Sequence, residues 1–147
     1  MIMNKIMKNN KLFIFLIIFL LVISGCYNKT VNNNEVDSSM NIIINEKEYI
    51  INLENNDTTK EFINLLPLQL EMSELNGNEK YAYLDDELIV DSTNIKHINA
   101  GDVMLYGNNC LVIFYKSFDT SYSYTKIGYI NNLPNLGNDN IKVIIKK

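Results

Sequence analysis

The chain has 147 residues, with 17 acidic and 13 basic side chains and a formal charge of −4. All 13 basic residues are lysines, so no activity of this chain can depend on the planar fork of an arginine guanidinium. The acidic balance also argues against a nucleic-acid partner, because that kind of binding needs basic side chains that neutralise phosphates.

The first 26 residues have the three-part pattern of an export signal. Lysines at positions 5, 8 and 11 precede an apolar run at 12–23, and Ser24-Gly25-Cys26 follows. The run is shorter than the roughly 20 residues that a permanent membrane helix needs. The junction resembles the lipobox of bacterial lipoproteins, which implies a signal peptide at 1–25 and a lipid on Cys26. The alternative is an uncleaved N-terminal membrane helix, and both place the rest of the chain outside the cytoplasm.

Cleavage after residue 25 of 147 leaves 122 residues with 10 lysines and 17 acids, a charge of −7. This charge does not favour an anionic membrane surface, so the lipid must hold the protein at the bacterial cell membrane. After Cys26, the polar stretch up to residue 39 has no apolar period and predicts a flexible tether. Residues 40–147 suffice for one core, so we expect a single domain and a monomer.

The domain is predicted to consist mostly of short strands separated by turns. In chain order, strands are predicted at 41–44 and 48–53, a helix at 58–66, and further strands at 68–73, 81–84, 88–90, 103–106, 110–115, 123–130 and 141–145. Turn-forming residues occupy 45–47, 76–78 and 107–109. This pattern predicts a mainly β protein, a small closed antiparallel barrel with one or two short helices.

The helix at 58–66 has its own signals in the sequence. Thr58 and Glu61 fit a capping box, and Pro67 ends the element. The apolar face around Phe62 favours a helix that covers an open end of the barrel.

Several segments together carry a family resemblance. They are Leu66-Pro67-Leu68, the run 75–84 (LNGNEKYAYL), Ala100-Gly101-Asp102-Val103, Ile113-Phe114-Tyr115-Lys116 and the run 126–130 (KIGYI). Their order and spacing over 41–137 resemble the bacterial cyclophilin-like family. The resemblance implies a cyclophilin-like barrel. It does not imply prolyl isomerase activity, because that activity relies on an arginine. The family's usual Pro-Trp-Gly turn is replaced here by residues 106–109.

The candidate ligand-binding residues come from these segments and from the many aromatic side chains. They are Glu79, Tyr83, Asp102, Tyr106, Phe114, Tyr115, Tyr124 and Lys126. Glu79 and Asp102 could form a carboxylate pair for acid–base work. Equally, Glu79 could pair with a lysine, and Asp102 could shape a turn. Alternation along 122–130 places Tyr122, Tyr124 and Lys126 on one side of a strand, where exposed tyrosines beside a lysine would suit a ligand.

The remaining chemistry-bearing residues favour structural roles. His97 is the only histidine, which excludes sites with two histidine ligands, and we expect it at the surface. Asp85-Asp86-Glu87 lacks the ligand spacing of a calcium loop and is typical of a solvated turn. Cys110 lies in an apolar run and is expected to be a buried thiol, the alternative being a reactive one. We expect no metal and no cofactor.

Two functions of different classes are compatible with these features. The preferred one is a lipid-anchored, extracytoplasmic domain of the cyclophilin-like type that binds a small ligand or peptide without catalysis. The competitor is an enzyme, either a residual peptidyl-prolyl isomerase or an acid–base catalyst using Glu79 and Asp102.

Overall fold

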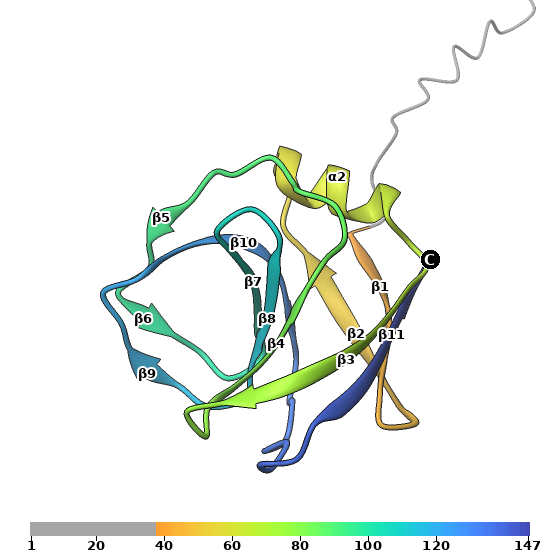
Figure 1. Ribbon diagram of the computed structural model, residues 1–147, viewed down its shortest axis with the longest axis vertical. Coiled ribbons are helices and arrows are strands. Elements are labelled where there is room, and N and C mark those ends of the chain that lie inside the picture. The colour runs from red at the N-terminus through yellow and green to blue at the C-terminus, as the bar shows by residue number, and fades with distance from the viewer. Residues whose placement is uncertain (1–37) are drawn as a thin grey trace, which may run out of the picture. The chain divides into compact units, whose positions relative to one another are not determined.

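The computed structural model describes residues 38–147. The predicted signal peptide, the lipid site at Cys26 and the tether up to residue 37 lie outside the described residues. Eight strands form a closed antiparallel barrel in the order β2-β1-β11-β3-β4-β8-β7-β10, and β10 pairs with β2 to close it. Figure 1 shows this barrel with a short helix, α2, across one end. The predicted small, closed β-barrel is confirmed.

The barrel strands lie close to the predicted segments. They are β1 (Ser39–Ile44), β2 (Lys47–Leu53), β3 (Leu68–Leu75), β4 (Glu79–Tyr83), β7 (Asp102–Tyr106), β8 (Cys110–Phe114), β10 (Ser123–Ile130) and β11 (Ile141–Lys146). Three short strands lie outside the barrel: β5 (Thr93–Asn94) pairs with β10, and β6 (His97–Ile98) pairs with β9 (Phe118–Asp119). The β6–β9 ribbon was not predicted.

The barrel interior is filled by apolar side chains from all eight strands. Because successive side chains of a strand point to opposite faces, alternate residues of each strand meet in the interior. The fully buried members include Ile42, Ile51, Met72, Val103, Leu105, Leu111, Ile113, Ile127, Val143 and Ile145. This packing gives the barrel a filled core, so a ligand must bind outside it.

The helix α2 (Asp57–Asn64) covers the barrel end as predicted, but its cap differs from the predicted one. Phe62 is fully buried in the interior cluster. The cap is Asn56, whose Oδ1 accepts a hydrogen bond from the Thr59 backbone N–H at 2.8 Å. The predicted capping-box residues instead bind the segment 85–92: Thr58 donates to the Ile89 carbonyl at 2.7 Å, and Glu61 accepts from the Ile89 N–H at 2.6 Å. A capping box at Thr58 is therefore wrong.

The strand predicted at 88–90 is also wrong. This segment is an irregular strap that crosses α2, and its backbone groups bind side chains and a turn rather than a neighbouring strand. The Leu88 N–H donates to the Asn108 carbonyl at 2.7 Å, and Leu88 is buried in the interior cluster. The apolar side chains of residues 88–90 thus resemble those of a strand, although the backbone of this segment pairs with no strand of the described chain.

A second apolar cluster lies on the outer face of the barrel wall. Its buried members are Ile98, Met104, Cys110, Val112, Phe114 and Tyr124, and Phe118 of β9 packs against them. All five residues of β8 are buried, because one face of this strand packs on the interior and the other under the β6–β9 ribbon. Burial on both faces explains the continuous apolar run of the sequence.

A bulge in β10 changes which of its side chains share a face. Lys126 pairs with Met104 and Gly128 with Val103, so Ile127 is an extra residue in the ladder. After the bulge, Ile130 enters the interior cluster and Tyr129 is exposed. The strict alternation predicted over 122–130 therefore holds only up to the bulge.

None of the helices within residues 38–147 has the length and apolar character needed to cross a membrane.

Candidate functional site

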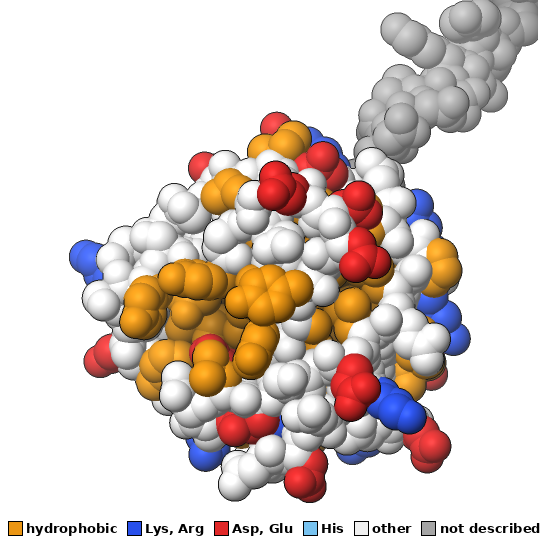
Figure 2. Space-filling model, viewed as in Figure 1, with side chains coloured by type: hydrophobic (Ala, Val, Ile, Leu, Met, Phe, Trp, Pro, Cys, Tyr) orange, Lys and Arg blue, Asp and Glu red, His pale blue; other side chains and the backbone are white. Residues whose placement is uncertain are grey.

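A cavity lined by aromatic side chains lies on the outer face of the barrel wall, between β4, β7, β8 and β10 on one side and the β9 segment on the other. It has a volume of about 510 Å³, which is within the usual range for small-molecule sites. Figure 2 shows the hollow ringed by hydrophobic side chains on the side where Figure 1 labels β6 and β9, with acidic atoms visible at its floor. Five tyrosines line it: Tyr81, Tyr83, Tyr106, Tyr122 and Tyr124.

Strand pairing explains how the floor and wall of the cavity are assembled. Alternation along β4 turns Glu79, Tyr81 and Tyr83 to the outer face of the barrel, opposite the interior residue Ala82. In the β4–β8 register, Tyr81 lies opposite Val112, and Tyr83 lies opposite Cys110. The cavity is therefore built on regular strands, which hold side chains more precisely than loops do.

The tyrosines form a rim of mutually packed aromatic rings. Tyr106 lies 6.1 Å from Tyr122 and 5.5 Å from Tyr124, measured between ring centroids, and Tyr81 lies 6.0 Å from Tyr83. Three of the rings remain open to solvent, with exposed fractions of 67% for Tyr83, 61% for Tyr122 and 48% for Tyr106. Exposed aromatic surface gathered around a hollow is typical of a binding site.

Glu79 is the acidic group of the cavity floor. Only 9% of the residue is exposed, and its carboxylate receives no hydrogen bond from any residue of the described part of the chain. Burial raises the pKa of the Glu79 carboxyl above its ordinary value, and the negative charge of Glu74 adds to the rise. A mostly buried carboxylate that no protein group binds is unfavourable for the folded protein unless water or a ligand in the cavity compensates its charge.

The charge of Glu79 also acts on its neighbours. Burial, with the Glu79 charge as the next cause, raises the pKa of Tyr124 to about 12 and raises the pKa of the Cys110 thiol. At neutral pH both groups are therefore protonated. Cys110 is a buried free thiol, which agrees with the structural role predicted for it and gives no support to a nucleophile.

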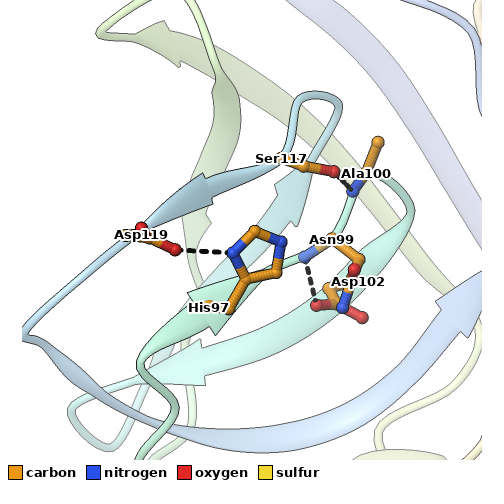
Figure 3. Close-up of polar contacts among 6 residues, drawn as sticks. All are labelled: His97, Asn99, Ala100, Asp102, Ser117 and Asp119. Atoms are coloured by element: carbon orange, nitrogen blue, oxygen red, sulfur yellow. Dashed lines mark hydrogen bonds and ion pairs between the residues drawn. The ribbon is translucent and has the colours of Figure 1, made fainter.

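The wall contributed by β9 is held in place by polar contacts. His97 Nδ1 and Asp119 Oδ1 are 2.6 Å apart on the two strands of the ribbon, and the Ser117 hydroxyl accepts from the Ala100 N–H at 2.9 Å (Figure 3). The Thr120 N–H donates to the Lys96 carbonyl at 2.8 Å. His97 is exposed, as predicted, and its observed role is to hold this wall.

Residues 42–146 match the model of the cyclophilin-like family, and this match covers the barrel except for the first three residues of β1. The chain belongs to the cyclophilin-like family. No curated protein and no solved structure matches it. The resemblance seen in the sequence is therefore confirmed.

In this cyclophilin-like domain, half of the predicted site residues meet at the cavity. Glu79, Tyr83, Tyr106 and Tyr124 line it, and Phe114 packs beneath it with its ring 5.4 Å from that of Tyr124.

Asp102 does not join Glu79 in a carboxylate pair. Glu79 pairs with Phe114 of β8, and Val103, the residue next to Asp102, pairs with Ile113 of the same strand. Strand β8 therefore lies between the two acids, which places them roughly 10 Å apart, the distance of two strand spacings. Its Oδ2 accepts from the Asn99 N–H at 2.8 Å, as Figure 3 shows, which fits the turn role that the sequence left open. An acid–base pair of Glu79 and Asp102 is therefore not formed.

Tyr115 and Lys126 also lie away from the cavity. The Tyr115 hydroxyl donates to Glu74 at 3.2 Å, and the buried Lys80 ammonium lies 5.1 Å from the centre of its ring. Lys126 is exposed on β10 and does not line the cavity. The predicted pairing of a lysine with the exposed tyrosines is not found at this site.

Sequence reasoning did not assign Tyr81 or one wall of the cavity to the site. Tyr81 follows Glu79 at the spacing of two that marks one face of a strand, and this signal was available in the sequence. Tyr122 was placed beside Tyr124 by alternation, but the wall at 118–121 carries no such signal, because its position depends on the β6–β9 pairing.

Candidate metal-ligating side chains do not cluster in the part of the chain that the structure describes. No three His, Cys, Asp or Glu side chains within 38–147 lie close enough together to hold a metal ion. Asp85-Asp86-Glu87 is exposed at the start of the strap, as expected of a solvated turn.

Proposed function

We propose that this protein is a lipid-anchored, extracytoplasmic cyclophilin-like domain that binds a small ligand or peptide in its tyrosine-lined cavity without catalysis. The observation that carries the proposal is the unpartnered Glu79 carboxylate, surrounded by exposed tyrosine rings in a cavity of about 510 Å³. Such an arrangement of a few polar groups within an aromatic surface is typical of ligand sites.

The anchoring part of the proposal is supported by the N-terminal sequence. The basic, apolar and small-residue regions end at Cys26, and the polar residues 27–37 supply a tether to the barrel. In a bacterial host fed a labelled fatty acid, we expect label on the wild-type protein and none on the Cys26→Ser variant. Label on the variant, or wild-type protein in the cytosolic fraction, would contradict the anchor.

Binding without catalysis is supported by the surroundings of Glu79. An acid–base enzyme would need a second group close to this carboxylate, but Asp102 is bound to its own turn and Tyr124 keeps its proton up to about pH 12. Prolyl isomerase chemistry lacks its arginine. Turnover of a proline-containing test peptide by the full-length protein would overturn the non-catalytic assignment.

The binding function is tested on the full-length protein in neutral detergent. A library of neutral, anionic and cationic small molecules and short peptides is screened by thermal shift, and hits are titrated calorimetrically. We expect hits that lose at least about tenfold in affinity when Tyr106 is replaced by alanine, because that truncation removes an aromatic wall. Tyr129→Ala is the matched control, since Tyr129 is similarly exposed at 45% but lies outside the cavity. No hit, or equal losses in both variants, would exclude the cavity as the site.

A further inference from the structure

The charges around the cavity are all of one sign. Glu79 and Asp119 line it, whereas no lysine side chain within residues 38–147 does, and the sequence contains no arginine. Asp119 is paired with His97 in the ribbon. Glu79 is therefore the lining acid whose carboxylate has no hydrogen-bonding partner among the described residues. An anionic ligand would be repelled here, and a neutral one would leave the carboxylate uncompensated.

Glu79 differs from an ordinary surface acid in its surroundings. With 9% of the residue exposed, water reaches the carboxylate only from the cavity, and no described residue donates to it. Electrostatic attraction is stronger in such a partly desolvated site than in water. A positively charged group in the cavity would both gain this attraction and remove the cost of the unpaired charge.

The tyrosines supply a second attraction for the same kind of ligand. The face of an aromatic ring carries negative potential and attracts cations that lie within about 6 Å of its centre. Five tyrosines line the cavity, and the tilted and edge-to-face packing of Tyr106 with Tyr124 and Tyr122 turns rings at different angles around the hollow. Aromatic rings gathered around a carboxylate are a known way to bind ammonium groups.

From these observations we infer that the cavity binds an organic cation, with an alkylammonium group against the Glu79 carboxylate and the tyrosine rings around it. This inference rests on the proposed binding function and names its ligand class. The ammonium group belongs either to a small free cation or to the lysine side chain of a peptide, and the same chemistry recognises both.

The test uses pairs of probes that differ only in charge. Choline is compared with 3,3-dimethyl-1-butanol, which replaces the quaternary nitrogen by carbon, and Nα-acetyl-lysine methylamide is compared with its norleucine counterpart. Binding to the full-length protein is measured by calorimetry at pH 8. We expect at least one cation to bind at least about tenfold more tightly than its neutral counterpart. Tighter binding of choline would identify a small cation as the ligand, and tighter binding of the lysine probe would identify a peptide.

Variants then test whether the preference for cations depends on the Glu79 charge and on the tyrosine rings, the two features that predict it. Glu79→Gln is expected to remove the preference for charge, so that the cation and its neutral counterpart bind alike. Glu71→Gln is the control, because it removes the same charge from an exposed residue outside the cavity. Tyr83→Leu should weaken cation binding severalfold, whereas Tyr83→Phe keeps the ring and should not. Tyr83 is 67% exposed, so both variants should fold.

A pH series on choline, whose own charge does not titrate, gives an independent readout. Its affinity should fall as the pH is lowered through the pKa of Glu79, and it should be constant in Glu79→Gln. Tyr124 and Cys110 do not mimic this change, because the pKa of Tyr124 is about 12 and burial raises the pKa of Cys110 above its ordinary value of 9.0. Glu74, Asp119 and His97 are present in both proteins, so a contribution from any of them would also appear in Glu79→Gln. A pH response that survives Glu79→Gln would assign the effect to one of these acids and overturn the role of Glu79.

The outcomes distinguish a wrong ligand class from a wrong binding function. If neutral ligands bind in the cavity and show the Tyr106→Ala loss while neither cation is preferred, the ligand class is wrong and the binding function stands. If no probe and no library compound binds, both are wrong.

Discussion

Strand β4 carries two neighbouring charged residues, Lys80 and Glu79, whose surroundings in the barrel differ. Lys80 points to one end of the barrel interior, where its ammonium donates to the carbonyls of Gly137 and Asp139 at 2.7 and 2.8 Å and lies near the Tyr115 ring. Glu79 points to the outer cavity and receives no hydrogen bond from the described residues. Both are buried, at 0% and 9% exposed.

Because Lys80 has hydrogen-bonding partners within the protein and Glu79 has none among the described residues, we assign a structural role to Lys80 and a binding role to Glu79. The protein satisfies the charge of Lys80 with its own groups, so this lysine joins the 135–139 loop to the barrel. The charge of Glu79 is left open to a cavity. A buried charge with partners contributes to the fold, whereas a buried charge without them is a cost that a binding site can justify.

The largest effect is expected on the structural side of this comparison. Lys80→Met keeps much of the side-chain volume but removes two hydrogen bonds from a charged donor to the Gly137 and Asp139 carbonyls, which should lower the free energy of unfolding by about 2 kcal/mol. Urea unfolding of the full-length protein measures this loss. Because Lys80 faces away from the cavity, ligand affinity should be unchanged. A stable Lys80→Met variant would show that the 135–139 loop does not need the lysine.

Glu79→Gln should change the free energy of unfolding in the opposite direction and stabilise the protein. Burial raises the folded-state pKa of Glu79 above its ordinary value of 4.5, so the folded protein binds more protons than the unfolded one between these two pKa values. The ionised carboxylate therefore lowers stability as the pH rises through this window, and the cost is complete above it. Removing the charge should stabilise the protein by about 1 kcal/mol at pH 8.

The pH dependence makes this prediction specific. Below pH 4.5 Glu79 is protonated in both states, so the gain from Glu79→Gln should disappear there. Glu71→Gln, on an exposed residue, should show no such pH-dependent gain. A loss of stability in Glu79→Gln at pH 8 would mean that the carboxylate is satisfied within the protein, and the contrast with Lys80 would fail.

A smaller effect is expected on Cys110, which lines the same cavity as Glu79. Burial is the main reason that its pKa is raised, and the Glu79 charge is the second. Alkylation by iodoacetamide at pH 8 should therefore be slow in the folded protein and only severalfold faster in Glu79→Gln. Mass spectrometry of the Cys110 peptide follows the reaction. Fast alkylation of the wild type would support the reactive thiol that the sequence left open.

The smallest effect on stability is expected at the rim of the cavity. Tyr83 is largely exposed, so Tyr83→Phe and Tyr83→Leu should change the free energy of unfolding by less than about 0.5 kcal/mol. Thermal unfolding without ligand measures this. A large loss in either variant would assign Tyr83 to the fold and weaken its assignment to binding.

Much of the fold could be predicted from local patterns, and the exceptions have identifiable causes. The strand at 123–130 matches β10, because β-branched and aromatic residues favour strands wherever they pair. Its faces were predicted only in part, since the bulge at Ile127 interrupts the alternation. Residues 88–90 resemble a strand in their side chains, yet their backbone groups bind α2 and a turn.

The candidate site was predicted less completely than the fold. The sequence identified Glu79, Tyr83, Tyr106 and Tyr124, because acids and aromatics stand out within strands. It could not exclude Asp102, whose separation from Glu79 depends on β8 lying between them. Nor could it find the wall at 118–121, which lies in the cavity only because β9 pairs with β6.

The sequence by itself therefore determined the closed barrel and its helical cover, because alternation and turn residues act over a few neighbouring positions. Only the tertiary structure decided that Lys80 is satisfied and Glu79 is not. Lys80 binds carbonyls that lie 57 and 59 residues further along the chain. The wall that faces Glu79 comes from residues 118–122, and strand register and barrel closure place these segments in space. The cavity is a property of that placement, since no single segment of the chain contains it.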